Sequence, residues 1–138
     1  MTHEDKELLL QDLSARLPYG VMCNIGLKYP LQLQRIFVDR LDGILLDFYK
    51  DGDDYQVYLS EVKPYLRPMS SMTLEEHRDW MKYCKADYDC EFQPEPTFNF
   101  ESCILSINWL NQHHFDYNNL IEEGLAIAVT KENNPYKE

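Results

Sequence analysis

Histidine and cysteine side chains are the groups of this sequence that could bind a metal ion. The candidates are His77, Cys84, Cys90, His113 and His114. Zinc accepts imidazole nitrogen and thiolate sulfur in tetrahedral sets, so residues of these types could form a metal centre. Their spacing matches no known zinc pattern, and adjacent histidines on a helix point in different directions. Ordinary surface and core roles are therefore favoured, with a small metal-dependent enzyme as the alternative, and we predict no cofactor.

Cys84 is also a candidate nucleophile, because His77 precedes it on the same face of a predicted helix. A thiol nucleophile needs a base within hydrogen-bonding reach, and these two residues are two helical turns apart. The sequence contains no glycine-rich phosphate loop, no GxSxG motif and no HExxH motif. An enzyme is therefore not favoured, and a thiol enzyme is the second form of the alternative.

Three closely spaced carboxylates, those of Asp51, Asp53 and Asp54, could in principle bind calcium. In a calcium loop the next ligand position would be a carboxylate or amide, but this sequence has Tyr55 there and lacks the closing glutamate. The run Asp51-Gly52-Asp53 is instead typical of a solvated turn between two strands. No metal site is predicted here.

Acidic residues are concentrated in two stretches of a chain whose formal net charge is −11. The range 39–61 has seven acidic and two basic residues, and the range 86–101 has five acidic and no basic residues. Direct nucleic-acid binding is disfavoured, because clustered Lys and Arg must supply the contacts to phosphate. The stretches could serve solubility alone or form a docking surface for a basic protein. The candidate interaction residues are Asp51, Asp53, Asp54, Asp87, Asp89, Glu91 and Glu95.

A switch from strand to helix lies in the middle of the chain. The range 55–67 is predicted to be a strand that loses pairing near Pro64 and Pro68, which cannot donate backbone hydrogen bonds. Thr73 and Glu76 have the spacing of a capping box, so a helix should begin at Leu74. One face of that helix is predicted to pack on the sheet, with Trp80 at its border. The residues of that face are Leu74, His77, Met81 and Cys84.

The remaining elements complete an α+β prediction. Thr2 and Asp5 form a capping box for an N-terminal helix over 3–16, where leucines make an apolar stripe. Four short strands joined by tight turns predict an antiparallel meander. The predicted strands are 19–25, 33–39, 44–49 and 55–66.

Two to three helices are predicted to follow the meander, including the one that begins at Leu74. A further helix is expected over 104–113, and Asp116 could cap a short helical segment over 120–123 that ends at Gly124. We expect a surface loop over 87–96, an extended piece over 97–100 and a frayed tail over 133–138. The whole range 1–138 is interpreted as a single domain.

Cysteine usage and hydropathy indicate the compartment. The four cysteines include no CxxC pair, and the N-terminus has no charged-then-apolar signal segment. No apolar run approaches the roughly 20 residues that a membrane helix needs. We therefore expect a cytoplasmic protein without a membrane span. The ten tyrosines are a weak indication of a binding surface, although they could simply line the strands.

Three blocks of the sequence carry a resemblance. They are KELLLQDLSARLPYGVMC, VKPYLRPMSSMTLEEH and SINWLNQHHFDYNNLIEEGLA. The sequence resembles a group of small uncharacterised proteins encoded by gut Bacteroidales and by phages and mobile elements of that order. This resemblance implies an intracellular and phage-related context, and it brings no catalytic residues.

Together these observations favour a non-enzymatic protein that acts through protein contacts. The partner is expected to be a protein, with a basic surface that complements the acidic stretches. A phage context would suit an inhibitor of a host nucleic-acid-binding or defence protein. The alternative is the metal-dependent or thiol enzyme described above, and the sequence leaves the oligomeric state open.

Overall fold

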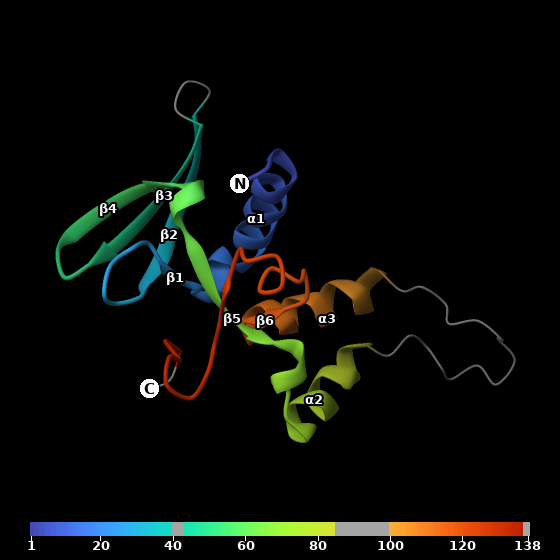
Figure 1. Cartoon of the computed structure of the whole chain (residues 1–138). Coiled ribbons are helices and arrows are strands. Elements are labelled where there is room, and N and C mark those ends of the chain that lie inside the picture. The colour runs from blue at the N-terminus through green and yellow to red at the C-terminus, as the bar shows by residue number, and fades with distance from the viewer. Residues whose placement is uncertain (40–42, 85–99, 137–138) are drawn as a thin grey trace, which may run out of the picture.

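The computed structural model describes residues 1–39, 43–84 and 100–136 (Figure 1). Its helices are α1 (His3–Arg16), α2 (Leu74–Cys84) and α3 (Phe100–Gln112). Its strands are β1 (Met22–Asn24), β2 (Leu31–Asp39), β3 (Gly43–Lys50), β4 (Asp53–Tyr58), β5 (Lys63–Pro68), β6 (Phe115–Asp116) and β7 (Ile127–Ala128). Short 3-10 turns occupy Leu17–Tyr19, Leu59–Glu61 and Met69–Ser71. Among the described residues, no helix is both long and apolar enough to cross a bilayer.

The strands form one mixed sheet, so the α+β class is confirmed. Strands β1 to β4 pair consecutively as an antiparallel meander, but the sheet has more than the four strands predicted and is not antiparallel throughout. The sheet has seven strands in the order β4-β3-β2-β1-β5-β6, with β7 also paired to β5. Strands β1 to β5 pair antiparallel, whereas β6 and β7 run parallel to β5. The two short parallel strands follow α3, in a part of the chain where no strand was predicted.

The break in the predicted strand 55–66 explains the different topology. A 3-10 turn at Leu59–Glu61 divides it into β4, which pairs with β3, and β5, which pairs with β1. Leu59 is buried, and the Glu61 carboxylate accepts a hydrogen bond of 3.3 Å from the Tyr58 backbone N–H. Burial of one side chain and this local bond turn the chain from one end of the sheet to its middle.

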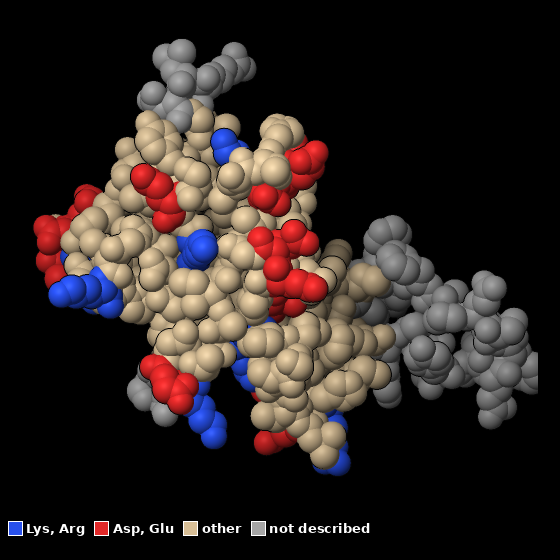
Figure 2. Space-filling view, viewed as in Figure 1, with Lys and Arg blue, Asp and Glu red and all other residues tan. Residues whose placement is uncertain are grey.

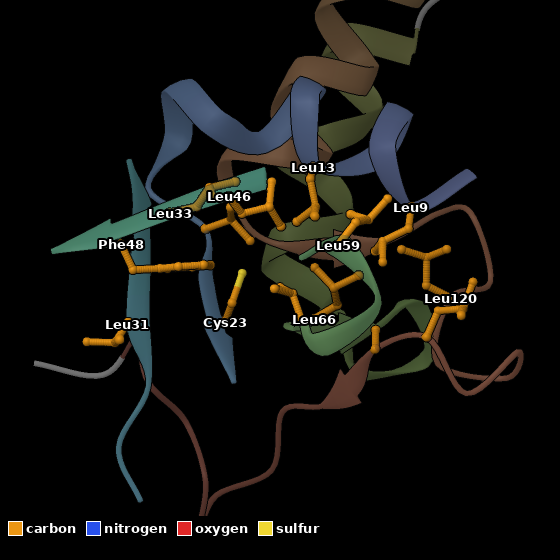
Figure 3. Close-up of a cluster of buried hydrophobic side chains, with 14 residues drawn as sticks. Leu9, Leu13, Cys23, Leu31, Leu33, Leu46, Phe48, Leu59, Leu66 and Leu120 are labelled. Carbon is orange, nitrogen blue, oxygen red and sulfur yellow. The ribbon is translucent and has the colours of Figure 1, made fainter. Parts of the chain in front are cut away.

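Helix α1 covers one face of the sheet and fits the sequence prediction over its whole length. Its capping box is present, with the Thr2 hydroxyl accepting from the Asp5 backbone N–H at 3.1 Å. Leu9 and Leu13 of α1 are fully buried and belong to one cluster with Leu46 and Phe48 of β3 (Figure 3). The main core therefore lies between α1 and this face of the sheet.

Helices α2 and α3 pack side by side next to the sheet and share a second, smaller core around Trp109, Leu110 and Phe115 (Figure 1). The capping box of α2 is confirmed, because Glu76 N–H donates to the Thr73 hydroxyl at 3.1 Å. The predicted buried face of α2 is wrong. Leu74 is 68% exposed and Met81 is 43% exposed. His77 is exposed as well.

Polar contacts rotate α2 away from the orientation that its apolar residues suggested. Arg67 of β5 makes two hydrogen bonds of 2.6 and 2.7 Å to the Glu76 carboxylate. The Trp80 indole N–H donates to the Ser106 carbonyl at 3.2 Å, so the half-buried Trp80 faces α3. Glu76 and Trp80 are one helical turn apart and therefore lie on the same face of α2. This face packs against β5 and α3.

The C-terminal segment also differs from the sequence prediction. Asp116 accepts hydrogen bonds from the backbone of Leu120 and Ile121, but the range 120–123 forms turns rather than a helix. The predicted frayed tail covers 133–138, of which the structure describes residues 133–136. There the Tyr136 hydroxyl donates to the Tyr65 carbonyl at 2.7 Å, and its ring stacks on His114.

Candidate interaction surface

The hairpin of β3 and β4 carries the acidic residues that the sequence indicated. Its turn is Asp51-Gly52, between the paired residues Lys50 and Asp53. Both turn residues have positive φ, 52° for Asp51 and 89° for Gly52, which is the geometry of a type I′ turn. This turn matches the natural twist of two paired strands, so it presents its side chains from a well-defined position.

Three carboxylates project from this turn into solvent. Asp51, Asp53 and Asp54 are all exposed, and none belongs to an ion pair within the described part of the chain. Figure 2 shows acidic side chains gathered at the left end of the molecule, where Figure 1 places this turn. Unpaired charges of one sign create a local negative potential that attracts cationic groups. We call Asp51, Asp53 and Asp54 the acidic tip.

Lys50, the basic residue that precedes the turn, contacts an aromatic ring. The Lys50 ammonium group lies 3.9 Å from the ring centre of Tyr29, in cation–π geometry. The hydroxyls of Tyr29 and Tyr55 lie 3.2 Å apart. The hydrogen bond with Tyr29 and partial burial raise the pKa of Tyr55, and the charges of Asp53 and Asp51 raise it further. Lys50, Tyr29 and Tyr55 therefore form a group of contacts next to the acidic tip.

An open sheet face adjoins the acidic tip on β2, β3 and β4. Alternate residues of these strands point away from α1, and their register forms rows across the sheet. One row is Phe37, Leu45 and Tyr58, in which Phe37 is 42% exposed and Tyr58 is 49% exposed. Tyr49, which is opposite Asp54, is 54% exposed. Exposed aromatic side chains of this kind are enriched at protein interfaces.

A polar row runs beside the aromatic one. Asp47 accepts a hydrogen bond of 2.9 Å from the Gln56 side chain and lies 3.4 Å from Arg35. The Arg35 guanidinium lies 5.6 Å from the ring centre of Phe37. These contacts hold the side chains of the open face in place, so fewer rotamers are lost when a partner binds. We call this region, with Phe37, Tyr49 and Tyr58, the open face.

Most of the second acidic stretch, residues 86–99, lies outside the part of the chain that the structure describes. Asp87, Asp89, Glu91 and Glu95 all lie outside the described residues, as does the predicted loop 87–96. Another group of acidic side chains in Figure 2 lies over the segment between β6 and β7. Glu122 and Glu123 are exposed in that segment.

The histidines and cysteines proposed as metal ligands are spread over different parts of the structure. His113 stacks on Trp109 at the end of α3, whereas His114 stacks on Tyr136 of the C-terminal segment. His77 is exposed on α2, and Cys90 lies outside the described residues. Within the described ranges, no group of three His, Cys, Asp or Glu side chains is arranged to hold a metal ion.

Cys84 likewise has an environment that disfavours its thiolate. Burial raises the pKa of the Cys84 thiol, and the nearby Cys103 raises it further despite a hydrogen bond with Ser106. A reactive cysteine usually needs the opposite shift, produced by a neighbouring cation or a helix N-terminus. Cys84 is instead the last residue of α2.

A groove of about 360 Å³ lies between α2 and the end of α3. Its lining combines acidic and basic side chains with aromatic rings. These residues are Glu75, Glu76, Arg78, Asp79, Lys82, Trp109 and His113. Because both charge signs occur, the groove shows no preference for a cationic or an anionic ligand, in contrast to the acidic tip.

A buried polar cluster was missed by sequence reasoning. Asp12 and Arg16 of α1 form a 2.8 Å ion pair with both side chains fully buried, and Asn118 donates to Asp12 at 2.9 Å. Burial and the charge of Arg16 lower the pKa of His114 to about 4. The one available signal was an acidic and a basic residue four positions apart within the leucine stripe of α1.

Comparison with other proteins adds no assignment. No family model matches this sequence, and comparisons with curated proteins and with solved structures also gave no match.

Proposed function

We propose that this protein is not an enzyme and acts by binding another protein through the acidic tip and the open face. The observation that carries the proposal is a hairpin whose turn end has three exposed carboxylates, which form no ion pair within the described residues, and whose strands carry exposed aromatic side chains, with Tyr49 opposite Asp54. Charge complementarity gives such a surface selectivity for a basic partner, and the aromatic residues supply contact area.

The geometry of the hairpin supports this role. A type I′ turn fixes the backbone of the acidic tip, and the sheet fixes the backbone of the open face. Pre-organised surfaces lose less conformational entropy on binding, so more of the contact energy appears as affinity. Long-range attraction between the tip and a basic surface also raises the association rate, in a manner that salt weakens.

A more specific version of the proposal concerns the partner. The acidic tip could occupy a site that normally receives phosphates, so the protein would inhibit a host nucleic-acid-binding or defence protein by charge mimicry. The formal net charge of −11 and the resemblance to phage-encoded and mobile-element proteins support this version. It places the protein in the cytoplasm, in keeping with free thiols at Cys23, Cys84 and Cys103.

A capture experiment with matched charge variants tests the proposal. The tagged protein is incubated with a lysate of the host cell at low and at high salt. The test variant combines Asp51→Asn, Asp53→Asn and Asp54→Asn, and the control combines Glu4→Gln, Glu122→Gln and Glu123→Gln. Both variants remove three negative charges from exposed positions without a large change in shape.

We expect a protein with a basic surface that is captured by the wild type and by the control at low salt. The same protein should be lost at high salt and with the test variant. Absence of any captured protein, or equal capture by both variants, would contradict the proposal.

The rival hypothesis of a metal-dependent enzyme is separable by a simple measurement. Elemental analysis of protein purified without a histidine tag reports bound zinc or other transition metals directly. A stoichiometric metal that is lost when His77 or His113 is replaced would favour the enzyme over the binding protein.

A further inference from the structure

The outer edge of β4 is the end of the sheet. Strand β4 pairs with β3 on one side and is the last strand in the sheet order, as its position at the left of Figure 1 shows. The closing pair of a hairpin with a two-residue turn exchanges both backbone hydrogen bonds, and pairs then alternate along the ladder. Lys50 and Asp53 are this closing pair. Asp54, Gln56 and Tyr58 therefore direct their backbone N–H and C=O groups away from β3.

The free part of this edge is short and well defined. The Tyr58 N–H donates to the Glu61 carboxylate at 3.3 Å, so one end of the edge is already occupied. Within the described residues, no backbone group outside the sheet ladder bonds to Asp54 or Gln56. The N–H and C=O groups of these two residues are available to an incoming strand.

The edge of strand β4 is protected by negative charge alone. Edges are commonly blocked by lysine, by proline or by a bulge. β4 has the sequence DDYQVY and keeps an unbroken register with β3, whereas the irregularity of this sheet region lies in β2 between Leu33 and Arg35. Its charges are all negative, from Asp53 and Asp54. Such an edge repels acidic strands but accepts basic ones.

We propose that the free edge of β4 binds an extended segment of the partner, rich in Lys or Arg, as an additional strand of the sheet. This inference rests on the proposed function and specifies how the partner is bound. The backbone of Asp54 and Gln56 supplies main-chain hydrogen bonds, and alternate side chains of the added strand reach either the acidic tip or Tyr58 of the open face. A second copy of this chain is disfavoured as the occupant, because its own edge carries the same negative charges.

Nuclear magnetic resonance of the full-length, ¹⁵N-labelled protein provides the test. The probe is a synthetic peptide of alternating Lys and Val, blocked at both ends, and the control peptide alternates Glu and Val. We expect the Lys–Val peptide to shift the amide resonances of Asp54 and Gln56 and to slow their hydrogen exchange. The Glu–Val peptide should leave both unchanged.

Two variants at the same position test the backbone contact. Gln56→Pro removes the edge-facing N–H, which is tolerated at an edge position, whereas Gln56→Thr keeps that donor. Both variants lose the side-chain hydrogen bond to Asp47, so their comparison isolates the backbone contact. Proline should weaken binding of the Lys–Val peptide about tenfold or more, through the lost hydrogen bond and the bulk of its ring. Threonine should have little effect, because it preserves the backbone donor and suits a strand.

The peptide offers a second measurement that does not depend on the stability of the proline variant. N-methylation of every second peptide residue blocks only one edge of the peptide, so one of the two methylated series should lose binding and the other should keep it. No binding of the Lys–Val peptide at millimolar concentration would overturn the inference, as would equal binding by both methylated series. If Gln56→Pro still captures a basic partner in a salt-dependent way, the proposed function stands and only strand addition fails.

Discussion

The guanidinium of Arg16 donates a 2.6 Å hydrogen bond to the backbone carbonyl of Phe115, ninety-nine positions later in the chain. The same side chain pairs with Asp12 at 2.8 Å, and both side chains are fully buried. Arg16 also lies 5.0 Å from the ring centre of Tyr117. One buried cation therefore links α1 to β6 and to the segment after it.

Removal of one partner of this ion pair should destabilise the fold strongly. We expect Asp12→Ala to lower the free energy of unfolding by about 3–5 kcal/mol, because Arg16 is left as an uncompensated buried charge. The double variant Asp12→Leu with Arg16→Met should lose less than the single variant, since no charge is then buried. Urea denaturation of the three proteins gives the comparison. A double variant less stable than Asp12→Ala would refute this account.

The orientation of α2 gives a second prediction. Thr73→Ala should cost about 1 kcal/mol, because the capping hydrogen bond to Glu76 is lost. Met81→Ala should change stability by only about 0.5 kcal/mol, because this side chain is 43% exposed. Equilibrium denaturation measures both. A loss of about 2 kcal/mol or more for Met81→Ala would show that this face of α2 is buried, as the sequence pattern had suggested.

His114 should make stability depend on pH in the mildly acidic range. Burial, and then the charge of Arg16, lower its pKa from 6.5 to about 4 in the folded protein. As the pH falls below 6.5, the unfolded chain takes up a proton that the folded chain does not bind, so stability is lost between about pH 6.5 and 4. His114→Asn keeps a residue that tolerates the positive φ of 65° but cannot titrate there. Urea denaturation across this range should show a flatter pH dependence for the variant, and identical slopes would contradict the prediction.

Glu76 should make stability depend on pH in a more acidic range than His114 does. Hydrogen bonds from Arg67 lower the pKa of its carboxyl from 4.5 to about 2. Partial burial opposes this shift, and the capping contact with Thr73 adds to it. The stability that Glu76 contributes is therefore present above pH 4.5 and is lost as the pH falls towards 2. Glu76→Gln should be less stable than the wild type at pH 7, with a difference that shrinks through this range. Denaturation at several pH values tests this, and a difference that does not change with pH would count against it.

Local signals in the sequence predicted those parts of the fold that depend on neighbouring residues. The capping boxes at Thr2 and Thr73 and the turn at Asp51-Gly52 were recognisable because each is complete within a few residues. The pairing of β5 with β1, instead of a continuation of β4 along β3, could not be predicted from neighbouring residues. It depends on burial of Leu59 and on contact between residues about forty positions apart in the chain.

The candidate site likewise has one part that neighbouring residues predicted and one part that depends on distant pairing. The acidic tip followed from composition and turn chemistry, whereas the open face required the register of β2, β3 and β4. The predicted orientation of α2 was wrong because Arg67, a residue outside the helix, fixes the orientation of the helix through its hydrogen bonds to Glu76. An apolar stripe predicts the buried face of a helix only when no stronger polar contact competes for its orientation.

Site-specific photo-crosslinking tests the central claim most directly. Tyr49 on the open face and Tyr83 on α2 are each replaced by benzoylphenylalanine, and the two proteins are irradiated in cells that express them. Both positions are exposed tyrosines, 54% and 38% respectively, so the photoreactive residue fits either site with little change in shape. The account predicts crosslinks from position 49 to a Lys- or Arg-rich segment of one protein, and their loss when Asp51, Asp53 and Asp54 are replaced by Asn. Crosslinks from position 83 alone, or crosslinks from position 49 that survive removal of the three charges, would contradict it.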